Sequence, residues 1–273
     1  MTIAELPFDD FPRVLPLYRS LNVCFPLISA VIQKRQRGQV FVNDSDDPQS
    51  ALVVNNFGFM SYVGRSDNYT FNEGLTQLLA TGHPLKRNYL LWYSPPERWK
   101  TALDQRGSGV VRCRKRTRFE LETNAVGYSD VESECPSGFQ LQTLVPSLFP
   151  QTSRFGLNID SRFWSSCDDF FENGFGVCLM KDQNMVSLCY SAAIVDGLAE
   201  IDVVTDPEFR AQGFAVIVTQ AFIRECAKRN VIATWDCFVD NVGSMKLAKR
   251  VGFREKNTYD FYSFNIPIEI SFT

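Results

Sequence analysis

Apolar residues follow helical spacing in some stretches of the chain and strand spacing in others, and this alternation predicts a mixed α/β protein. Residues 1–37 have helical spacing in two pieces, which a polar break at 20–22 separates, and the second piece ends at Gly38. The strands predicted after it are 39–42, 51–57, 59–63, 89–93 and 112–121, with helices at 69–80 and 95–103.

The C-terminal half begins with a predicted helix over 160–173, which Asp160 or Ser161 can cap and Gly174 ends. The elements predicted after it are strands 175–180, 185–194, 198–205 and 231–239, helices 215–229 and 244–251, and closing strands within 253–264. Residues 124–138 are rich in Ser, Glu, Asp, Pro and Gly. We therefore place a connection there, between an N-terminal α/β domain at 1–130 and a second domain at 139–273.

The predicted strand 198–205 carries two carboxylates on one face. Successive side chains of a strand point to opposite sides, so Glu200 and Asp202 lie about 7 Å apart on the same face. Ala199, Ile201 and Val203 form the other face. If that apolar face packs on the following helix, the carboxylates face the opposite layer.

The turn between this strand and the helix has the composition of a phosphate-binding nest. Gly213 lets the backbone approach an anion closely, and Ala215 keeps the first helical turn small. Arg210 adds a planar donor fork with a fixed positive charge. Backbone N–H groups at the positive end of a helix bind pyrophosphate, so the turn predicts such a site.

The run Arg210-Ala211-Gln212-Gly213-Phe214-Ala215 resembles the acetyl-CoA-binding motif of the GNAT superfamily of N-acetyltransferases. The second motif of that superfamily is an Asn that starts a helix ending at Gly-Phe, and Asn241 with Gly252-Phe253 is similar to it. The resemblance implies an α/β (α+β) GNAT acyl-CoA N-acyltransferase fold in the C-terminal half, with acetyl-CoA as co-substrate.

The same resemblance implies where acetyl-CoA would bind. The main chain of Val203, Val204 and Thr205 would pair with the pantetheine arm, because the central strand splays from the next one in this superfamily. The pyrophosphate would lie on the turn from Arg210 to Ala215, and the Asn241 side chain would hydrogen-bond the coenzyme arm. The turn residues concerned are Arg210, Ala211, Gln212, Gly213, Phe214 and Ala215.

Acetyl transfer to an amine requires a base, and Glu200 is the first candidate and Asp202 the second. Neighbouring carboxylates disfavour joint ionisation, which raises one pKa, although either could instead orient water or pair with an arginine. Many superfamily members carry a tyrosine seven residues after the motif Asn as the acid, but Ala248 stands there. Ser244 could substitute, Tyr259 or Tyr262 could reach in, or the thiolate could leave without a dedicated acid.

Segments throughout the chain look like the zwittermicin A resistance type of GNAT protein. They are Gly38 to Val42, Pro48 to Leu52, Phe163-Trp164, Asp168 to Gly176, Ala199 to Ile201, Thr205-Asp206 and Trp235 to Cys237. This resemblance implies acetylation of an amine on a small polar molecule, with an aminopolyol antibiotic as one such acceptor and antibiotic resistance as the outcome. It also implies that the N-terminal half could be a degenerate GNAT-like copy that contributes to the acceptor site.

Composition narrows the classes of function further. A net charge of −3 over 273 residues does not indicate a nucleic-acid partner. Eight cysteines without a C-x-x-C pair, together with a single histidine at His83, make a metal site improbable and favour buried thiols such as Cys178. No apolar run reaches the roughly 20 residues of a membrane span, and the N-terminus lacks a signal-peptide pattern, so we expect a cytoplasmic location.

The run from Arg112 to Leu121 allows two interpretations. As a strand it would place Arg112, Arg114, Arg116 and Arg118 on one face, which could bind RNA or another anion. We favour a solvated edge strand whose charges prevent sheet pairing, because no aromatic residues are interleaved on that face.

Two other functions remain open from the sequence. An acetyltransferase acting on a macromolecular amine, of a protein or an aminoacyl-tRNA, would use the arginine ladder. A non-catalytic coenzyme-binding module would explain Ala248. The oligomeric state is not indicated by the sequence.

Overall fold

The computed structural model describes residues 3–21, 23, 25–122 and 135–272, which fall into two compact units. Unit 1 comprises Met1–Arg116 and Tyr259–Thr273, and unit 2 comprises Thr117–Thr258. This division differs from the expected domains at 1–130 and 139–273, because both changes of unit fall inside long strands. Those strands are β6 (Val111–Leu121) and β12 (Phe253–Asn265). A strand that continues from one unit into the next has no break in its pattern to mark a boundary.

Most of the predicted connection at 124–138 lies outside the described residues. Among the helices that the structure describes, none combines the length and apolar character needed to cross a bilayer.

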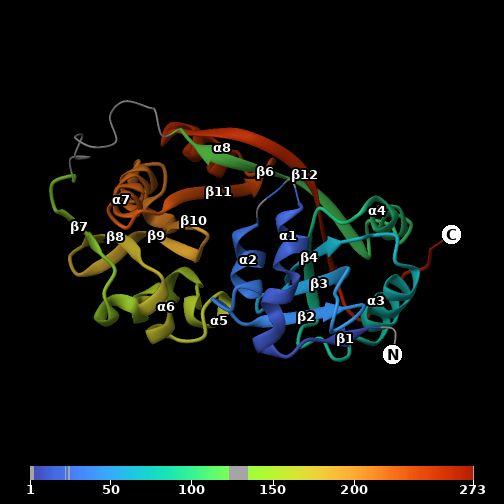
Figure 1. The fold of residues 1–273 in the computed structure, drawn as a ribbon. Coiled ribbons are helices and arrows are strands. Elements are labelled where there is room, and N and C mark those ends of the chain that lie inside the picture. The colour runs from blue at the N-terminus through green and yellow to red at the C-terminus, as the bar shows by residue number, and fades with distance from the viewer. Residues whose placement is uncertain (1–2, 22, 24, 123–134, 273) are drawn as a thin grey trace. The chain divides into compact units, whose positions relative to one another are not determined.

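Unit 1 contains an antiparallel meander followed by a parallel strand (Figure 1). Its strand order is β1-β2-β3-β4-β5-β12-β6. The elements before β6 are β1 (Ala4–Glu5), the 3-10 helix η1 (Phe8–Val14), α1 (Leu15–Arg19), α2 (Pro26–Ile32), β2 (Gly38–Val42), β3 (Ser50–Asn55), β4 (Phe59–Gly64), α3 (Tyr69–Thr81), β5 (Tyr89–Tyr93) and α4 (Glu97–Asp104). Strand β1 and the 3-10 helix η1 lie in a stretch where two helices were predicted, and the later elements agree closely with the sequence prediction.

Helix α3 shows why the local sequence folds as it does. The Asn68 side chain accepts a hydrogen bond from the Phe71 N–H at 3.0 Å and so caps the first turn. Gly82 ends the helix in the left-handed conformation. Its apolar positions Phe71, Leu75, Leu78 and Leu79 recur at helical spacing and are buried in the core of unit 1 together with Trp92 and Trp99.

Unit 2 has the strand order β12-β6-β11-β10-β9-β8-β7. Strands β7 to β10 are antiparallel in sequence order, and β11 is parallel to β10. Its elements after β6 are β7 (Phe139–Thr143), η2 (Pro146–Phe155), α5 (Ile159–Arg162), α6 (Cys167–Asn173), β8 (Gly176–Lys181), β9 (Asn184–Val195), β10 (Leu198–Thr205), η3 (Pro207–Phe209), α7 (Phe214–Lys228), β11 (Ile232–Phe238) and α8 (Val242–Arg250).

Two local expectations for unit 2 are wrong. The predicted helix over 160–173 is divided into α5 and α6, because Ser166 adopts an extended conformation and caps α6 by accepting from the Asp169 N–H at 3.1 Å. Strand β6 is not an edge strand, since it lies between β12 and β11. Its basic side chains therefore cannot serve to block sheet pairing.

Helix α7 packs on β8, β9 and β10 (Figure 1). Val218, Ala221 and Phe222 of α7 lie in one core cluster with Ala199, and the partly buried Ile201 and Val203 pack against it. The apolar face of β10 thus meets α7, as predicted. Glu200 and Asp202 consequently lie on the opposite face of the strand.

Both units repeat the order meander, helix, parallel strand, helix. In unit 1 these are β2-β3-β4, α3, β5 and α4, and in unit 2 they are β8-β9-β10, α7, β11 and α8. This repetition agrees with the expectation that the N-terminal half is a second, GNAT-like copy.

Replacing Phe222 with alanine tests the core of unit 2. Phe222 is fully buried and stacks on Phe175 with ring centroids 4.6 Å apart. The substitution is expected to lower the free energy of unfolding by about 3–5 kcal/mol, because it leaves a cavity. The matched control is Val242→Ala at a position that is 58% exposed, where the change is expected to stay within about 0.5 kcal/mol in urea titrations. Equal effects of the two substitutions would contradict this assignment of the core.

Candidate active site

Strands β10 and β11 pair only at their beginnings. The register pairs Leu198 with Ile232, Ala199 with Ala233 and Glu200 with Thr234. Pairing of β10 with β9 instead continues to Thr205 and Ser187. From Ile201 onward, β10 is therefore held along one side, and its other side can offer backbone N–H and C=O groups to an extended ligand. Val203, Val204 and Thr205, the residues expected to bind the pantetheine arm, lie on this stretch and are half-buried.

The turn after β10 opens onto the N-terminus of α7. Ala211 and Gly213 both have positive φ, at 61° and 84°, and Gly213 is the N-cap residue of α7. Glycine has no side chain that could cap the first turn, so the first N–H groups of this 15-residue helix are available to an external acceptor. A Cβ at Gly213 would meet no atom within 4 Å, which shows open space in front of the turn. This arrangement suits a pyrophosphate.

The other turn residues differ in what they present. The Arg210 side chain is exposed, and its Nε donates to the carbonyl of Thr205 at 3.2 Å, which ties the guanidinium to the end of β10. Ala211 and Gln212 are exposed, and Ala215 is half-buried. The Phe214 ring packs into the core 4.7 Å from Phe139, so Phe214 can contribute only its main chain to a ligand.

Asn241 and Ser244 lie at the start of α8. The Asn241 Oδ1 accepts from the Ser244 N–H at 3.1 Å and caps the helix, while its amide group retains donors for a ligand. The Ser244 hydroxyl accepts from the Trp235 Nε1 at 3.1 Å. Ala248, at the position of the usual tyrosine, is fully buried in the core.

The two other candidate acids, Tyr259 and Tyr262, belong to unit 1. The Tyr262 hydroxyl donates to the Asp104 carboxylate at 3.0 Å, and burial is the main cause that raises the pKa of Tyr262. Of the three candidate acids, Ser244 is the one that belongs to unit 2, the unit that also carries the coenzyme motif.

Glu200 lies in a buried network of charges. Arg118 donates to both of its carboxylate oxygens, at 3.0 Å and 2.7 Å, and the Thr234 hydroxyl donates to Oε2 at 2.8 Å. Arg118 also lies 3.3 Å from the Asp236 carboxylate. Burial raises the pKa of Glu200, Arg118 opposes that rise, and the charge of Asp236 adds to it. We define Arg118, Glu200, Thr234 and Asp236 as the buried charge cluster.

Asp202 has a more accessible carboxylate. Its side chain is 31% exposed, whereas that of Glu200 is 7% exposed. The Tyr190 hydroxyl donates to Asp202 Oδ2 at 2.7 Å, and Arg162 lies 3.3 Å from the same oxygen. Burial, followed by the charge of Asp202, raises the pKa of Tyr190 well above its ordinary value, so this phenol stays protonated and remains a donor.

The sequence left open that either carboxylate pairs with an arginine, and both do, but it did not identify the partners. Arg118 was grouped with the other arginines as part of a solvated ladder, but it is 5% exposed, whereas Arg112 is exposed. The available signal was Asp236 between Trp235 and Cys237, because an acid in an apolar strand requires a buried partner. Tyr190 and Arg162 carried no comparable signal.

The described cysteines and the histidine are not among the residues predicted for this site. Cys178, Cys189, Cys226 and Cys237 are buried in unit 2, as expected for structural thiols. Burial raises the pKa of Cys178 to about 12 and that of Cys226 to about 12, so neither thiol ionises readily. His83 is exposed in a loop. Across the described residues, no group of three or more His, Cys, Asp and Glu side chains is placed to hold a metal ion.

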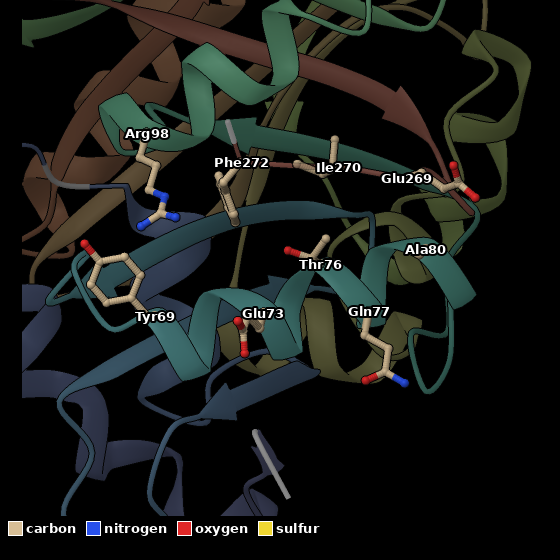
Figure 2. Close-up of a pocket in the computed structure, with 9 residues that line it drawn as sticks. All are labelled: Tyr69, Glu73, Thr76, Gln77, Ala80, Arg98, Glu269, Ile270 and Phe272. Atoms are coloured by element: carbon tan, nitrogen blue, oxygen red, sulfur yellow. The ribbon is translucent and has the colours of Figure 1, made fainter.

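Unit 1 does not repeat the open turn of unit 2. Its corresponding helix α3 begins behind Asn68, whose side chain already occupies a first-turn N–H. The C-terminal residues of the chain lie beside this helix, and a cavity of about 480 Å³ lies between α3, α4 and these residues (Figure 2). Figure 2 shows Arg98 of α4 between two aromatic rings, and its guanidinium carbon lies 4.7 Å from the Tyr69 centroid and 4.4 Å from that of Phe272.

Replacing Arg118 with methionine tests the buried charge cluster. Glu200 and Asp236 would then be buried without their shared cation, which is expected to cost about 3–5 kcal/mol of unfolding free energy near pH 8. The pKa of folded Glu200 would rise further above its unfolded value, so stability present at low pH is lost as pH rises through the folded pKa. Urea unfolding at about pH 5 should therefore show a smaller loss than at about pH 8.

The control for this prediction is Arg112→Met, on the exposed part of the same strand. It is expected to change the unfolding free energy by less than about 0.5 kcal/mol at either pH. A loss in the Arg118 variant that matches this control, or that does not depend on pH, would contradict the cluster as described.

Comparison with known proteins identifies relatives over most of the chain. A family model described as GNAT acetyltransferase matches residues 23–262. The chain is 22% identical over 239 residues to the uncharacterized N-acetyltransferase YdfB of Bacillus subtilis (strain 168), and the match covers 88% of this chain and 90% of that protein.

Solved structures agree with this match. A GCN5-related N-acetyltransferase-like protein from Streptococcus suis 89/1591 is similar with a TM-score of 0.73 and 19% identity, over 94% of this chain and 98% of the other. A tandem GNAT protein from the clavulanic acid biosynthesis pathway has a TM-score of 0.66 and 13% identity, over 96% of this chain and 98% of the other. At these identities the likeness establishes the fold, which is the mixed α/β fold predicted from the sequence.

Proposed function

Because the chain belongs to the GNAT acetyltransferase family, whose model matches residues 23–262, we propose that it acetylates a primary amine of a small polar molecule. The chain is an N-acetyltransferase, and acetyl-CoA is its co-substrate. The acceptor class and the roles of individual residues are the proposed part. The observation that supports them is the acidic face of β10, where Glu200 and Asp202 lie opposite the helix that carries the coenzyme motif.

The residues at the splayed strands suit acetyl-CoA. Val203, Val204 and Thr205 would hydrogen-bond the pantetheine arm through their main chain, and the Gly213 turn would hold the pyrophosphate. Asn241 would donate to the arm through its amide group. Acetyl-CoA supplies the activated thioester, and a backbone N–H of the open side of β10 can donate to the thioester carbonyl oxygen.

We infer that Asp202 accepts the proton of the acceptor amine. Its carboxylate is accessible enough for an amine to approach, and Tyr190 fixes its orientation through a 2.7 Å hydrogen bond. Glu200 was the first candidate in the sequence, but three donors already bind its two oxygens within the buried charge cluster. Glu200 would instead contribute negative charge that attracts a cationic amine.

Ser244 is the proposed donor to the leaving thiolate. Its hydroxyl oxygen accepts from Trp235, which leaves the hydroxyl proton available for donation. A thiolate is weakly basic compared with an alkoxide, so this step needs little help. Loss of the Ser244 hydroxyl is therefore expected to matter less than loss of Asp202.

The small-molecule acceptor is favoured over a macromolecular one. The macromolecular alternative depended on an exposed ladder of arginines, but Arg118 is buried in the charge cluster. Arg116 is half-buried and lies 5.0 Å from the Phe261 ring. Within the small-molecule class, the resemblance to the zwittermicin A resistance type favours an aminopolyol antibiotic, with antibiotic resistance as the biological result.

The acceptor proposal is tested by measuring thiol release from acetyl-CoA with a panel of small amines, including aminopolyols. Turnover that depends on a small amine is expected, with KM values that change only weakly with salt. Turnover only with protein or aminoacyl-tRNA amines, with steep salt dependence, would reinstate the macromolecular acceptor. Coenzyme binding without turnover of any amine would favour a non-catalytic module, the alternative that Ala248 suggests.

Substitution of the two carboxylates tests the assignment of the base. Asp202→Asn is expected to lower kcat by about 10²- to 10⁴-fold, because the amine would lose its proton acceptor. Glu200→Gln is expected to raise the acceptor KM with a smaller effect on kcat. The matched control is Asp196→Asn in the exposed β9–β10 turn, which should leave both constants unchanged. A larger kcat loss for Glu200→Gln than for Asp202→Asn would restore Glu200 as the base.

Two glycines offer a matched test of the coenzyme turn. Gly213 and Gly197 have positive φ values of 84° and 72°, and a Cβ at either would meet no atom within 4 Å. Alanine at either position carries a similar backbone strain of about 1 kcal/mol. Only Gly213→Ala is expected to raise the KM for acetyl-CoA, by about tenfold, whereas Gly197→Ala should leave it unchanged. The same rise for both variants would indicate a general loss of stability.

A further inference from the structure

Unit 1 contains a second cavity, of about 490 Å³, that is separate from the one in Figure 2. It lies where β2 begins, where β3 ends and where the chain enters β5. Its lining residues are Phe8, Arg37, Gly38, Gln39, Val54, Asn55, Asn56, Lys86 and Arg87. We call it the basic pocket, because each of its charged lining residues, Arg37, Lys86 and Arg87, is positive.

Two acidic residues that contact this region, Glu5 and Asp9, are engaged with other side chains. The Glu5 carboxylate accepts from the Gln39 Nε2 at 3.0 Å, and Asp9 pairs with Lys34 at 2.5 Å. Neither acid lines the cavity. The three positive charges therefore face a space without a carboxylate in its wall, which favours entry of an anion.

Among the residues of the basic pocket, Arg87 gives the strongest indication that an anion binds there. Its Nη1 donates to the Lys86 carbonyl at 2.6 Å and its Nη2 donates to Asn56 Oδ1 at 2.7 Å, and both acceptors are neutral. Its Nε is buried and has no hydrogen-bond acceptor within the described residues. Burial lowers the pKa of Arg87, as expected for a partly desolvated cation. An anion in the pocket would offset this cost.

The walls of the basic pocket are fixed by buried amides. Gln39 is 5% exposed, and its Oε1 accepts from the Lys86 N–H at 3.2 Å while its Nε2 donates to the Pro84 carbonyl at 3.1 Å. Asn55 is 3% exposed, and its Oδ1 accepts the N–H groups of Phe57, Gly58 and Phe59. The Asn55 Nδ2 has no acceptor within the described residues. These contacts hold the Lys86–Arg87 segment against β2 before any ligand arrives.

Phe8 gives one side of the pocket an apolar surface. It is 46% exposed. Lys34 lies 5.2 Å from its ring centroid, and its charge is paired with Asp9. A ligand that combines an anionic group with an apolar or planar part would use both kinds of surface.

We propose that the basic pocket binds a phosphorylated small molecule. Its phosphate would lie among Arg37, Lys86 and Arg87, and its apolar part would lie against Phe8. Three cations match the charge of about −2 on a phosphate monoester better than that of a single carboxylate. This site is independent of the acetyl-transfer chemistry, because all of its residues belong to unit 1, whereas the coenzyme turn belongs to unit 2.

Calorimetric titration of the full chain with inorganic phosphate, phenyl phosphate and benzoate tests the proposal. Phenyl phosphate is expected to bind about tenfold more tightly than inorganic phosphate because of its ring, and benzoate more weakly than either. Phe8→Ala should remove the advantage of phenyl phosphate and leave the affinity for inorganic phosphate unchanged. Tighter binding of benzoate would overturn the phosphate assignment and indicate a carboxylate site.

Charge variants locate the binding to the pocket. Arg87→Gln is expected to weaken phenyl phosphate at least about tenfold, and the matched control Arg106→Gln, an exposed arginine of the same unit, should change it less than about twofold. If Arg87→Gln fails to fold, the exposed pair Arg37→Gln with Lys86→Gln gives the same test. Equal binding by these variants and the control would overturn the site.

A last measurement separates this pocket from the coenzyme site. Arg87→Gln is expected to leave the KM for acetyl-CoA unchanged in the thiol-release assay. A raised KM would mean that the basic pocket holds a phosphate of the coenzyme itself, which would overturn a separate ligand. Failure of phosphate binding with normal acetyl transfer would remove only this inference.

Discussion

The end of the parallel pairing between β10 and β11, at Glu200 and Thr234, is the constraint on which the rest of unit 2 depends. Beyond it, β10 keeps a free backbone edge for an extended ligand. Where the pairing ends, Glu200 and Asp236 lie in a buried environment, and two buried carboxylates would be costly without a counter-charge. Arg118 meets both, because a planar guanidinium can bind one carboxylate with two hydrogen bonds and still reach another. A lysine could not reproduce this geometry, so the opening of the strands and the choice of arginine are linked.

The two units show how one topology leads to different sites. In unit 1 the parallel pairing of β4 and β5 is also short, and covers Phe59 with Leu91 and Met60 with Trp92. Yet Asn68 closes the N-terminus of α3, and the C-terminal segment packs along this helix, with the Ile268 N–H donating to the Leu79 carbonyl at 2.9 Å. Ile266, Ile268 and Ile270 complete the core there. In unit 1 the chain itself caps and covers this helix, whereas in unit 2 the N-cap is Gly213, which has no capping side chain. This difference is what a degenerate copy would show.

Local signals in the sequence predicted most elements, and they also indicated the turn that we propose for the coenzyme, because a strand, Gly213 and an apolar helix follow one another directly. Long-range contacts were not predictable in this way. Arg118 and Glu200 are 82 positions apart, and the alternation of arginines in β6 gave no reason to separate Arg118 from the other, less buried arginines of the strand. The limits of the units were also hidden, since β6 and β12 continue through both. The division of helix 160–173 depended on Ser166, whose capping role competes with helical periodicity.

The absence of a tyrosine at Ala248 follows from packing. Ala248 is fully buried in the same cluster as Val251 and Phe253, so a tyrosine there would have to displace the core or turn α8. Ser244 lies one turn earlier, where Trp235 fixes its hydroxyl at 3.1 Å. A short hydroxyl at that place can reach only a group that lies close to the start of α8, where Asn241 also stands. Under the proposed function, the start of α8 would hold the coenzyme arm and supply a proton to the leaving thiolate, and the acidic face of β10 would deprotonate the amine.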